Sequence, residues 1–320
     1  MKNDILVSVG VLTYNSSSTI IETLESIKRQ TYPKIELVIS DDCSRDDTVE
    51  KCKDWLVKNE KYFESANLLT VDENTGVSAN ANRCQRASTG LWIKIIAGDD
   101  ILFDKCVSIC VNFAQEHPKA MFIGSQHIPF RTVDNEMEIE FSENDKIRIE
   151  KLKLFNSLDV SEQYKLIFER DLIFTPTLFY KKDLFKIVSF NEKYKTLEDY
   201  PFKLDVLRLG IKYYHIEQDT VYYRISNNSI SNNVSNKLFS SWYKTYHQFE
   251  KDYKYPLWNY CEKFLCSYRY IVKLIFDNVL LNRRNAICYC LLQLMLFQYT
   301  SLLKKIIEVI RNGRTKIHII

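Results

Sequence analysis

The chain has 320 residues and a mass of 37.9 kDa, long enough to bury one large core or two modest ones. Hydrophobic residues make up 46% and charged residues 27%, which excludes a disordered or fibrous protein and is typical of a globular one. The net charge of +3 is unevenly placed: residues 261–320 hold ten Lys/Arg against three Asp/Glu, a net +7, which leaves −4 on the other 260 residues. This asymmetry indicates that the C-terminal segment meets an anionic partner, either a membrane surface or a nucleic acid.

The nine cysteines are odd in number, scattered, and mostly part of apolar patterns. No CxxC pair and no His/Cys cluster with zinc spacing is present, so we predict reduced structural thiols in a cytosolic chain. None of the five histidines has a metal-binding spacing, and His215 is predicted to be structural. We also expect neither a signal peptide nor a transmembrane helix, since no apolar stretch approaches the roughly 20 residues that a bilayer requires.

Strand and helix patterns alternate along the first part of the chain, with short connections. Strands are predicted at Ile5–Leu12, Ile35–Ser40, Asn67–Val71, Leu91–Ile96 and Ala120–Gly124. Helices are predicted at Ile20–Ile27, from Asp46-Asp47-Thr48 onward, at Val77–Ala87 and at Asp104–His117. This alternation predicts an α/β fold, with a mostly parallel Rossmann-like sheet and helices on both of its faces.

The pattern changes after the fifth strand. Residues 129–171 are charged and irregular, which predicts an inserted, mobile segment that faces the substrate. Regular elements then return, with strands at Thr175–Tyr180, Ile211–Ile216 and Thr220–Arg224 and a helix at Tyr200–Leu209. Everything after the Asn/Ser-rich loop 226–236 reads as helical, so we place a catalytic domain at 1–234 and a helical region at 235–320.

Two adjacent carboxylates, Asp99 and Asp100, directly follow the predicted strand Leu91–Ile96. Open α/β sheets bind their ligands at the carboxyl ends of strands. Neighbouring carboxylates repel each other unless a cation or the hydroxyls of a sugar lie between them, so the pair indicates a metal and polyphosphate site. The alternative is an ordinary strand-to-turn exit, where Gly-Asp-Asp is common.

Four further features accompany this pair. Two of them end predicted strands: Val9-Gly-Val-Leu-Thr-Tyr-Asn15 and Ile39-Ser-Asp-Asp-Cys-Ser44. The other two precede predicted helices: Asn74-Thr-Gly-Val-Ser78 and Leu197-Glu-Asp-Tyr-Pro-Phe202. The helix after Ser78 carries Asn80, Asn82 and Arg83. Taken together and in this order, the five features resemble the family 2 glycosyltransferases, inverting enzymes of the GT-A fold. The resemblance covers roughly residues 5–231.

The resemblance implies a role for each matching position. The nucleotide of the donor would be bound by Leu12, Thr13, Tyr14, Asp42, Gly76, Asn82 and Asp99. Asp42 would accept an N–H of a uracil or a related ring, and Asp99 would bond the ribose or help the metal site. Asp100 would bind Mn²⁺ or Mg²⁺ that bridges the diphosphate, and Asp199 would be the general base. The chemistry agrees, because a cation offsets the charge that develops on the leaving diphosphate and a carboxylate must deprotonate the acceptor hydroxyl.

Alternatives remain open at several of these positions. Glu198 and Asp199 could simply form the acidic first turn of a helix, and Asp41 equals Asp42 as a base-binding acid by chemistry alone. Asn82 and Arg83 could form a solvated helix face. Lys94 is predicted to be an edge-strand or snorkelling residue rather than a ligand.

The sequence departs from the family pattern at three places. Ala97 replaces the usual first Asp of the metal motif, and Cys43 stands where glycine is common. Ser226 occupies the usual histidine position of a Tyr-Arg-x-His segment, which leaves Arg224 as the candidate phosphate contact there. The Gln-x-x-Arg-Trp signature of processive synthases is absent, so one sugar is expected per encounter.

The segment Ile287–Phe297 is strongly apolar and has basic residues on both sides. It predicts an amphipathic helix on an anionic membrane surface, with a helical cap on the catalytic domain as the alternative. The complete prediction is a metal-dependent, inverting hexosyltransferase at the cytoplasmic face of the plasma membrane. It would move one sugar from a nucleotide-sugar, UDP-linked by first choice, to a lipid-diphosphate-linked glycan in O-antigen or capsule synthesis, without nucleic acid. The rival is a nucleotide-sugar-binding protein without turnover, which would not need Asp199.

Overall fold

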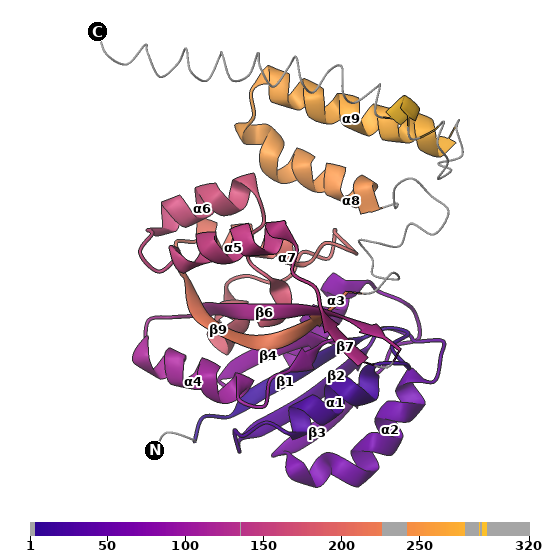
Figure 1. Cartoon of the computed structure of the whole chain (residues 1–320), viewed down its shortest axis with the longest axis vertical. Helices are drawn as coiled ribbons and strands as arrows, with labels where there is room; N and C mark the ends of the chain where they lie inside the picture. The colour runs from indigo at the N-terminus through magenta and orange to yellow at the C-terminus, as the bar shows by residue number, and fades with distance from the viewer. Residues whose placement is uncertain (1–3, 135, 226–241, 279–287, 289, 293–320) are drawn as a thin grey trace. The chain divides into compact units, whose positions relative to one another are not determined.

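The computed structural model describes residues 4–134, 136–225, 242–278, 288 and 290–292 (Figure 1). The chain forms two compact units, Met1–Ser226 and Asn227–Ile320. The predicted domain boundary at residue 235 and the departure at Ser226 both fall within residues 226–241, outside the described ranges.

The first unit contains a sheet of nine strands in the order β3-β2-β1-β4-β8-β6-β9-β5, with β7 paired to β6 (Figure 1). The strands are β1 (Val7–Thr13), β2 (Ile35–Asp41), β3 (Ser65–Leu69), β4 (Trp92–Ala97), β5 (Ile101–Leu102), β6 (Phe122–Val133), β7 (Glu136–Ile139), β8 (Phe179–Lys181) and β9 (Tyr213–Arg224). The four strands from β3 to β4 are parallel, and β8 is antiparallel to β4. The predicted α/β sheet is therefore confirmed.

Seven α-helices are described in the first unit. They are α1 (Ile20–Lys28), α2 (Thr48–Asn59), α3 (Val77–Ala87), α4 (Cys106–Glu116), α5 (Glu143–Lys153), α6 (Val160–Glu169) and α7 (Asp199–Arg208), with short 3₁₀ turns at η1 (Glu60–Tyr62), η2 (Thr175–Thr177) and η3 (Lys182–Lys186).

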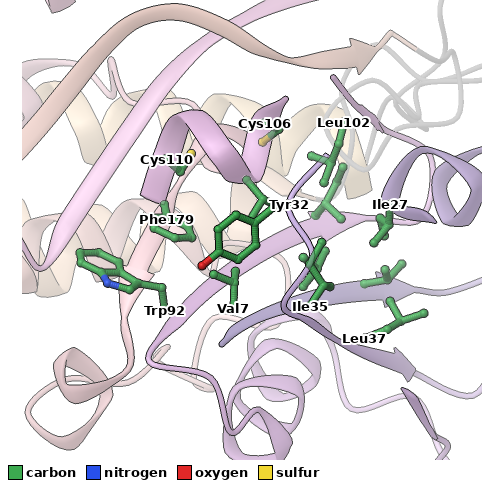
Figure 2. Packing of buried hydrophobic residues seen from close by; sticks show 14 of the residues in the cluster. Val7, Ile27, Tyr32, Ile35, Leu37, Trp92, Leu102, Cys106, Cys110 and Phe179 are labelled. Carbon is green, nitrogen blue, oxygen red and sulfur yellow. The ribbon is translucent and has the colours of Figure 1, made fainter. Parts of the chain in front are cut away.

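Strand β1 lies at the centre of the core because both of its faces are covered. Val7, Val9 and Val11 alternate along one face and pack in a cluster with apolar residues of α1, α2 and α4, part of which Figure 2 shows. Gly10 points to the other face, where an added Cβ would lie 2.4 Å from the Sγ of Cys84 on α3. Only glycine lets α3 approach so closely, and this packing places the N-terminus of α3 beside the strand ends.

The prediction of an irregular chain over residues 129–171 is wrong. Strand β6 continues to Val133 and pairs with β7, and α5 and α6 occupy most of the remainder. Each helix begins with a capping box, in which Ser142 pairs with Asp145 and Asp159 pairs with Glu162. These local signals were present in the sequence, but the high charge of the segment obscured the helical pattern.

Two predicted strand boundaries also differ. The segment predicted as a strand at Thr175–Tyr180 begins as the 3₁₀ turn η2, because Pro176 favours the first turn of a helix, and only Phe179–Lys181 forms β8. The two strands predicted between Ile211 and Arg224 are one strand, β9, which pairs with β6 through two shifts in register.

The second unit contains α8 (Trp242–Phe249), a π-helical turn η4 (Glu250–Lys254), a 3₁₀ turn η5 (Tyr255–Leu257) and α9 (Tyr260–Asn278). Val272 and Phe276 of α9 pack with Cys288. Of the predicted surface helix Ile287–Phe297, only 288 and 290–292 are described. Within the described ranges, no helix combines the length and hydropathy that crossing a bilayer requires.

Candidate active site

The carboxyl ends of β1, β2 and β4 meet at one edge of the sheet. Thr13 pairs with Asp41 and Leu12 with Ala97 in the strand register, so the residues that follow each strand are neighbours. The N–H of Asp42 donates to the Thr13 carbonyl at 3.0 Å, which joins two of the three exits. This arrangement brings the predicted residues Leu12, Thr13, Tyr14, Asp42, Asp99 and Asp100 to the same edge.

Residues at the β1 exit remain available for a ligand. The hydroxyl of Thr13 is buried and has no hydrogen-bond partner among the described residues, and the Tyr14 side chain is 47% exposed. A buried hydroxyl without a partner is costly, so Thr13 is suited to bonding a bound molecule.

Asp42 and Asp41 differ in what their carboxylates bind. Asp41 accepts both the backbone N–H of Ser44 at 2.8 Å and its hydroxyl, so it holds the turn after β2. The Oδ1 atom of Asp42 accepts from Thr75 and Arg83. Among the described residues, its Oδ2 accepts only from the N–H of Gly76, at 2.7 Å. A carboxylate oxygen accepts about two hydrogen bonds, so Oδ2 of Asp42 has capacity for one more donor.

These hydrogen bonds also keep Asp42 ionised. Burial alone would raise the pKa of Asp42, but the hydrogen bonds from Thr75, Arg83 and Gly76 together lower it. Gly76 has a φ of +90° at the start of α3, and an added Cβ would lie 2.8 Å from the Lys195 carbonyl. Only glycine fits this position without strain.

Asn82 and Arg83 have different roles in the structure. The amide NH₂ of buried Asn82 donates to the Phe190 carbonyl and to Glu192, both at 2.8 Å, and its oxygen accepts from the N–H of Phe190 at 3.0 Å. Both amide hydrogens are therefore used within the protein, and we leave Asn82 out of the proposed donor site. Arg83 instead bonds Asp42, at 3.1 Å, and Ser40, so it positions the acid rather than forming a solvated face.

Asp99 and Asp100 receive little direct neutralisation from the protein. Oδ1 of Asp100 accepts the backbone N–H of Arg224 at 2.9 Å, and its buried Oδ2 has no hydrogen-bond partner in the part of the chain that the structure describes. The guanidinium of Arg224 donates to the backbone carbonyl of Asp99 at 2.8 Å, to Thr132 and to Glu22. Arg224 thus supports the backbone of the pair, and each of its three guanidinium nitrogens bonds a protein atom instead of lying open to a phosphate.

Electrostatics at this pair favour a bound cation. Burial raises the pKa of Asp100 well above its usual range, and the neighbouring charge of Asp99 raises it further. Burial also raises the pKa of Asp99, against the lowering effect of Arg224. A hard divalent cation takes carboxylate oxygens as ligands and relieves both effects, so Asp100 through Oδ2, with Asp99 beside it, fits Mn²⁺ or Mg²⁺. Ala97 supplies no ligand.

Asp199 lies in a hydrogen-bonded network of opposite character. Its Oδ2 accepts from the Thr175 hydroxyl and from the buried Nζ of Lys203 at 2.9 Å, and its Oδ1 accepts from the N–H of Tyr200 at 2.8 Å. Lys203 also bonds Asp171 at 2.9 Å. Burial alone would raise the pKa of Asp199, but the charge of Lys203 and these hydrogen bonds lower it, so the carboxylate stays ionised.

The two acids at the start of α7 differ strongly in pKa. Burial, together with the charge of Asp199, raises the pKa of Glu198 to about 8. Burial raises the pKa of Tyr223 on β9 to about 12, and the charges of Asp100, Asp99 and Asp199 act on it in the same direction. Tyr223 is therefore within electrostatic range of Asp99, Asp100 and Asp199.

Sequence reasoning missed the partners of Asp199. Asp199 directly precedes the predicted helix Tyr200–Leu209 and lies four residues before Lys203, a spacing that could have suggested their ion pair. Asp171 and Thr175 come from another part of the chain, and no local signal indicates them. The interpretation of Lys94 is corrected: it lies on β4 between β1 and β8, is fully buried, and donates to the Pro176 carbonyl at 2.7 Å.

Solved structures share this fold. Staphylococcus aureus TarS 1–349 in complex with UDP-GlcNAc superimposes with a TM-score of 0.57 at 18% identity, covering 86% of this chain and 73% of that one. A mannosyltransferase from Pyrobaculum calidifontis in complex with GDP-Man and Mn²⁺ gives a TM-score of 0.54 at 16% identity, covering 91% of this chain and 68% of that one.

Curated proteins with similar sequences include named glycosyltransferases. The Escherichia coli protein WfaP, named as a UDP-Glc:alpha-D-GlcNAc-diphosphoundecaprenol beta-1,3-glucosyltransferase, is 27% identical over 237 residues, covering 73% of this chain and 82% of WfaP. Two further relatives from Bacillus subtilis match over only 44% and 36% of their own lengths. The model of the family described as Glycosyl transferase family 2 matches residues 8–174, slightly more than half of the chain, and the chain therefore belongs to that family.

Proposed function

We propose that this chain transfers one sugar from a nucleoside diphosphate-sugar to a glycan acceptor, with inversion at the anomeric carbon and with a divalent cation. The observation that carries the proposal is the contrast between the two acid pairs. Asp100 has a buried carboxylate oxygen that no described residue bonds, whereas Asp199 is ionised and already paired with Lys203. One pair thus suits a cation, and the other suits a proton acceptor.

The cation would be bound by Asp100, with Asp99 beside it. A divalent ion at this place supplies positive charge to the leaving diphosphate as the glycosidic bond breaks. Thr13 and Tyr14 at the end of β1, together with Asp42 and Gly76, would bind the nucleotide, with the free position on Oδ2 of Asp42 accepting an N–H of the base. UDP is our first choice of nucleotide, in line with the UDP-GlcNAc complex of TarS.

Asp199 would take the proton from the acceptor hydroxyl as that oxygen attacks the anomeric carbon. A single displacement from the face opposite the diphosphate inverts the configuration, so only one base is required. Lys203, Thr175 and the N–H of Tyr200 hold the carboxylate in one orientation. A protein that only binds nucleotide-sugars has no use for this network, which argues against the non-catalytic alternative.

We infer the acceptor and the cellular location from a named relative and from the charge of the C-terminal segment. WfaP is named for an acceptor sugar on diphosphoundecaprenol, and the basic C-terminal segment carries a net +7 over residues 261–320. Both support a lipid-diphosphate-linked glycan as the acceptor and an anionic membrane surface as a partner, in O-antigen or capsule synthesis.

A binding and turnover screen tests the proposal. Thermal unfolding of the full chain is followed with UDP-, GDP- and other nucleotide-sugars, each with and without Mn²⁺, because a ligand that binds the native state raises its melting temperature. The hit is then incubated with glycan acceptors and the products are analysed for sugar transfer. A cation-dependent shift with transfer supports the enzyme. A shift that no acceptor converts to product supports the binding protein, and no shift with any donor contradicts both.

A further inference from the structure

Three side chains of the second unit, outside the acid-rich site, converge on one point. His247 comes from α8, Glu250 opens the π-helical turn η4, and Cys266 comes from α9. The Sγ of Cys266 lies 3.4 Å from Nδ1 of His247 and 3.0 Å from Oε2 of Glu250. All three ligand atoms lie within 4.8 Å of one another, and no other such group occurs among the described residues.

The two separations from Sγ of Cys266 are near those of a zinc centre. Zinc bonds of about 2.3 Å to sulfur and 2.0–2.2 Å to nitrogen and oxygen, arranged tetrahedrally, place neighbouring ligand atoms about 3.3 to 3.6 Å apart. The sulfur–nitrogen separation of 3.4 Å lies within this range, and the sulfur–oxygen separation of 3.0 Å needs to widen by about half an ångström.

The surroundings orient the three ligands. The His247 ring stacks on Tyr270 with ring centroids 3.8 Å apart and planes 10° from parallel, which fixes the direction of Nδ1. While Oε2 of Glu250 faces the cysteine, its Oε1 lies 3.6 Å from the guanidinium of Arg269. Metal-binding carboxylates commonly have such a partner on the second oxygen.

Burial and charge suit the same ion. Cys266 and His247 are buried, and the Glu250 side chain is 12% exposed. Solvent therefore reaches the site from the glutamate side. One thiolate and one carboxylate balance the two charges of Zn²⁺. A mixed sulfur, nitrogen and oxygen set favours zinc over the hard cations that carboxylates alone select.

We propose that His247, Glu250 and Cys266 bind one Zn²⁺, with a water molecule as the fourth ligand, and that this ion ties the π-helical turn after α8 to α9. On binding, the thiol of Cys266 loses its proton to solvent. His247 coordinates through the lone pair of Nδ1 and carries its own proton on Nε2. The role is structural, because metal binding that needs a folded site stabilises that fold. This inference does not depend on the proposed sugar transfer.

Cobalt spectroscopy of the full chain, purified without a metal-binding tag, tests the site. The protein is stripped with chelator under reducing conditions and titrated with Co²⁺. We expect a sulfur-to-cobalt charge-transfer band that grows to one equivalent and disappears when Zn²⁺ is added. Cys266→Ser should abolish this band, whereas the matched control Cys261→Ser, on the same helix, should keep it.

Two further variants keep the test decisive. Glu250→Gln retains the thiol and should weaken Zn²⁺ binding at least about tenfold, as measured by competition with a coloured chelator. Asp100→Asn should keep the full cobalt band even if sugar transfer is lost, which separates this site from the donor site. A wild-type chain without the band, or a Cys266→Ser chain that retains it while folded by circular dichroism, would overturn the proposal.

Discussion

Asp99–Asp100 and Glu198–Asp199 are both pairs of adjacent acids, but the basic side chains near them make different contacts. At the first pair, the guanidinium of Arg224 bonds a backbone carbonyl and leaves Oδ2 of Asp100 without a partner among the described residues. At the second pair, the ammonium of Lys203 bonds the Asp199 carboxylate directly. Burial consequently raises the pKa of Asp100, whereas the counterion lowers the pKa of Asp199.

The difference shows that adjacent acids alone do not define a role. A buried carboxylate without a counterion is unstable as an anion, and a bound divalent cation stabilises it. A carboxylate with its own lysine is ionised at neutral pH without any ligand and can accept a proton as soon as the acceptor binds. Two adjacent acidic residues therefore suit a metal site in one place and a general base in the other.

The largest expected effect comes from removing the cation. We expect Asp100→Asn, or excess EDTA with the wild type, to reduce transfer by about a thousandfold or more, because a metal ion contributes several kcal/mol and each 1.4 kcal/mol is tenfold in rate. Initial rates with and without Mn²⁺ measure this. Full activity in EDTA would contradict the metal assignment, and recovery on adding Mn²⁺ controls for irreversible damage.

Replacing the counterion of the second pair should move the pH dependence. In Lys203→Met, burial of Asp199 is opposed by the hydrogen bonds from Thr175 and Tyr200 but no longer by the charge of the lysine, so the pKa of Asp199 rises and the ionised base is lost at a higher pH. We expect the acid limb of the kcat/KM profile to shift upward by at least about one pH unit. Lys203→Arg keeps the charge and is the matched control. If Lys203→Met does not fold, Thr175→Val should give a smaller shift in the same direction. An unshifted acid limb in these variants would exclude Lys203 and Thr175 from setting the base.

A smaller effect is expected at Arg224, which supports the backbone of the first pair. Arg224→Gln should weaken activation by Mn²⁺ about tenfold, the range found when groups behind a metal ligand are removed. Half-saturation by Mn²⁺ at fixed donor concentration measures it. If the phosphate contact suggested by the sequence is correct instead, the KM for the donor will rise while Mn²⁺ half-saturation stays the same.

The smallest effect concerns stability. The folded chain keeps a proton on Glu198 up to about pH 8, whereas the unfolded chain loses it near 4.5. Between these values the folded state binds more protons, so the free energy of unfolding falls as pH rises, by at most about 1.4 kcal/mol per pH unit from this group. Urea unfolding at pH 5 and pH 8 should show a smaller fall for Glu198→Gln than for the control Glu116→Gln at the exposed end of α4. Equal falls would contradict the assigned pKa.

Features that arise from neighbouring residues were predictable from the sequence. Short runs of apolar and β-branched residues predicted β1, β2 and β4. Because parallel strands end at a common edge of the sheet, this prediction also implied that Asp42 and Asp100 lie near each other. Helix α3 was predicted with its observed bounds, Val77–Ala87. The resemblance to family 2 glycosyltransferases is confirmed by the family match.

Features that depend on distant partners were not predictable. The amide of Asn82 bonds Phe190, more than a hundred residues away, so its structural role had no local signal. The same holds for Asp171 beside Lys203, and for Cys266, which lies 19 residues after His247 and outside any familiar zinc spacing. Burial of polar groups is decided by such tertiary contacts rather than by composition.

The most direct test of the account compares donor binding and transfer in Asp199→Asn. The affinity for the nucleotide-sugar is measured by titration calorimetry in the presence of Mn²⁺, and kcat is measured on the same preparation. The account predicts a donor Kd close to the wild-type value and a kcat lower by about a hundredfold or more, the range for losing a general base. A kcat equal to that of the wild type would remove Asp199 from the mechanism.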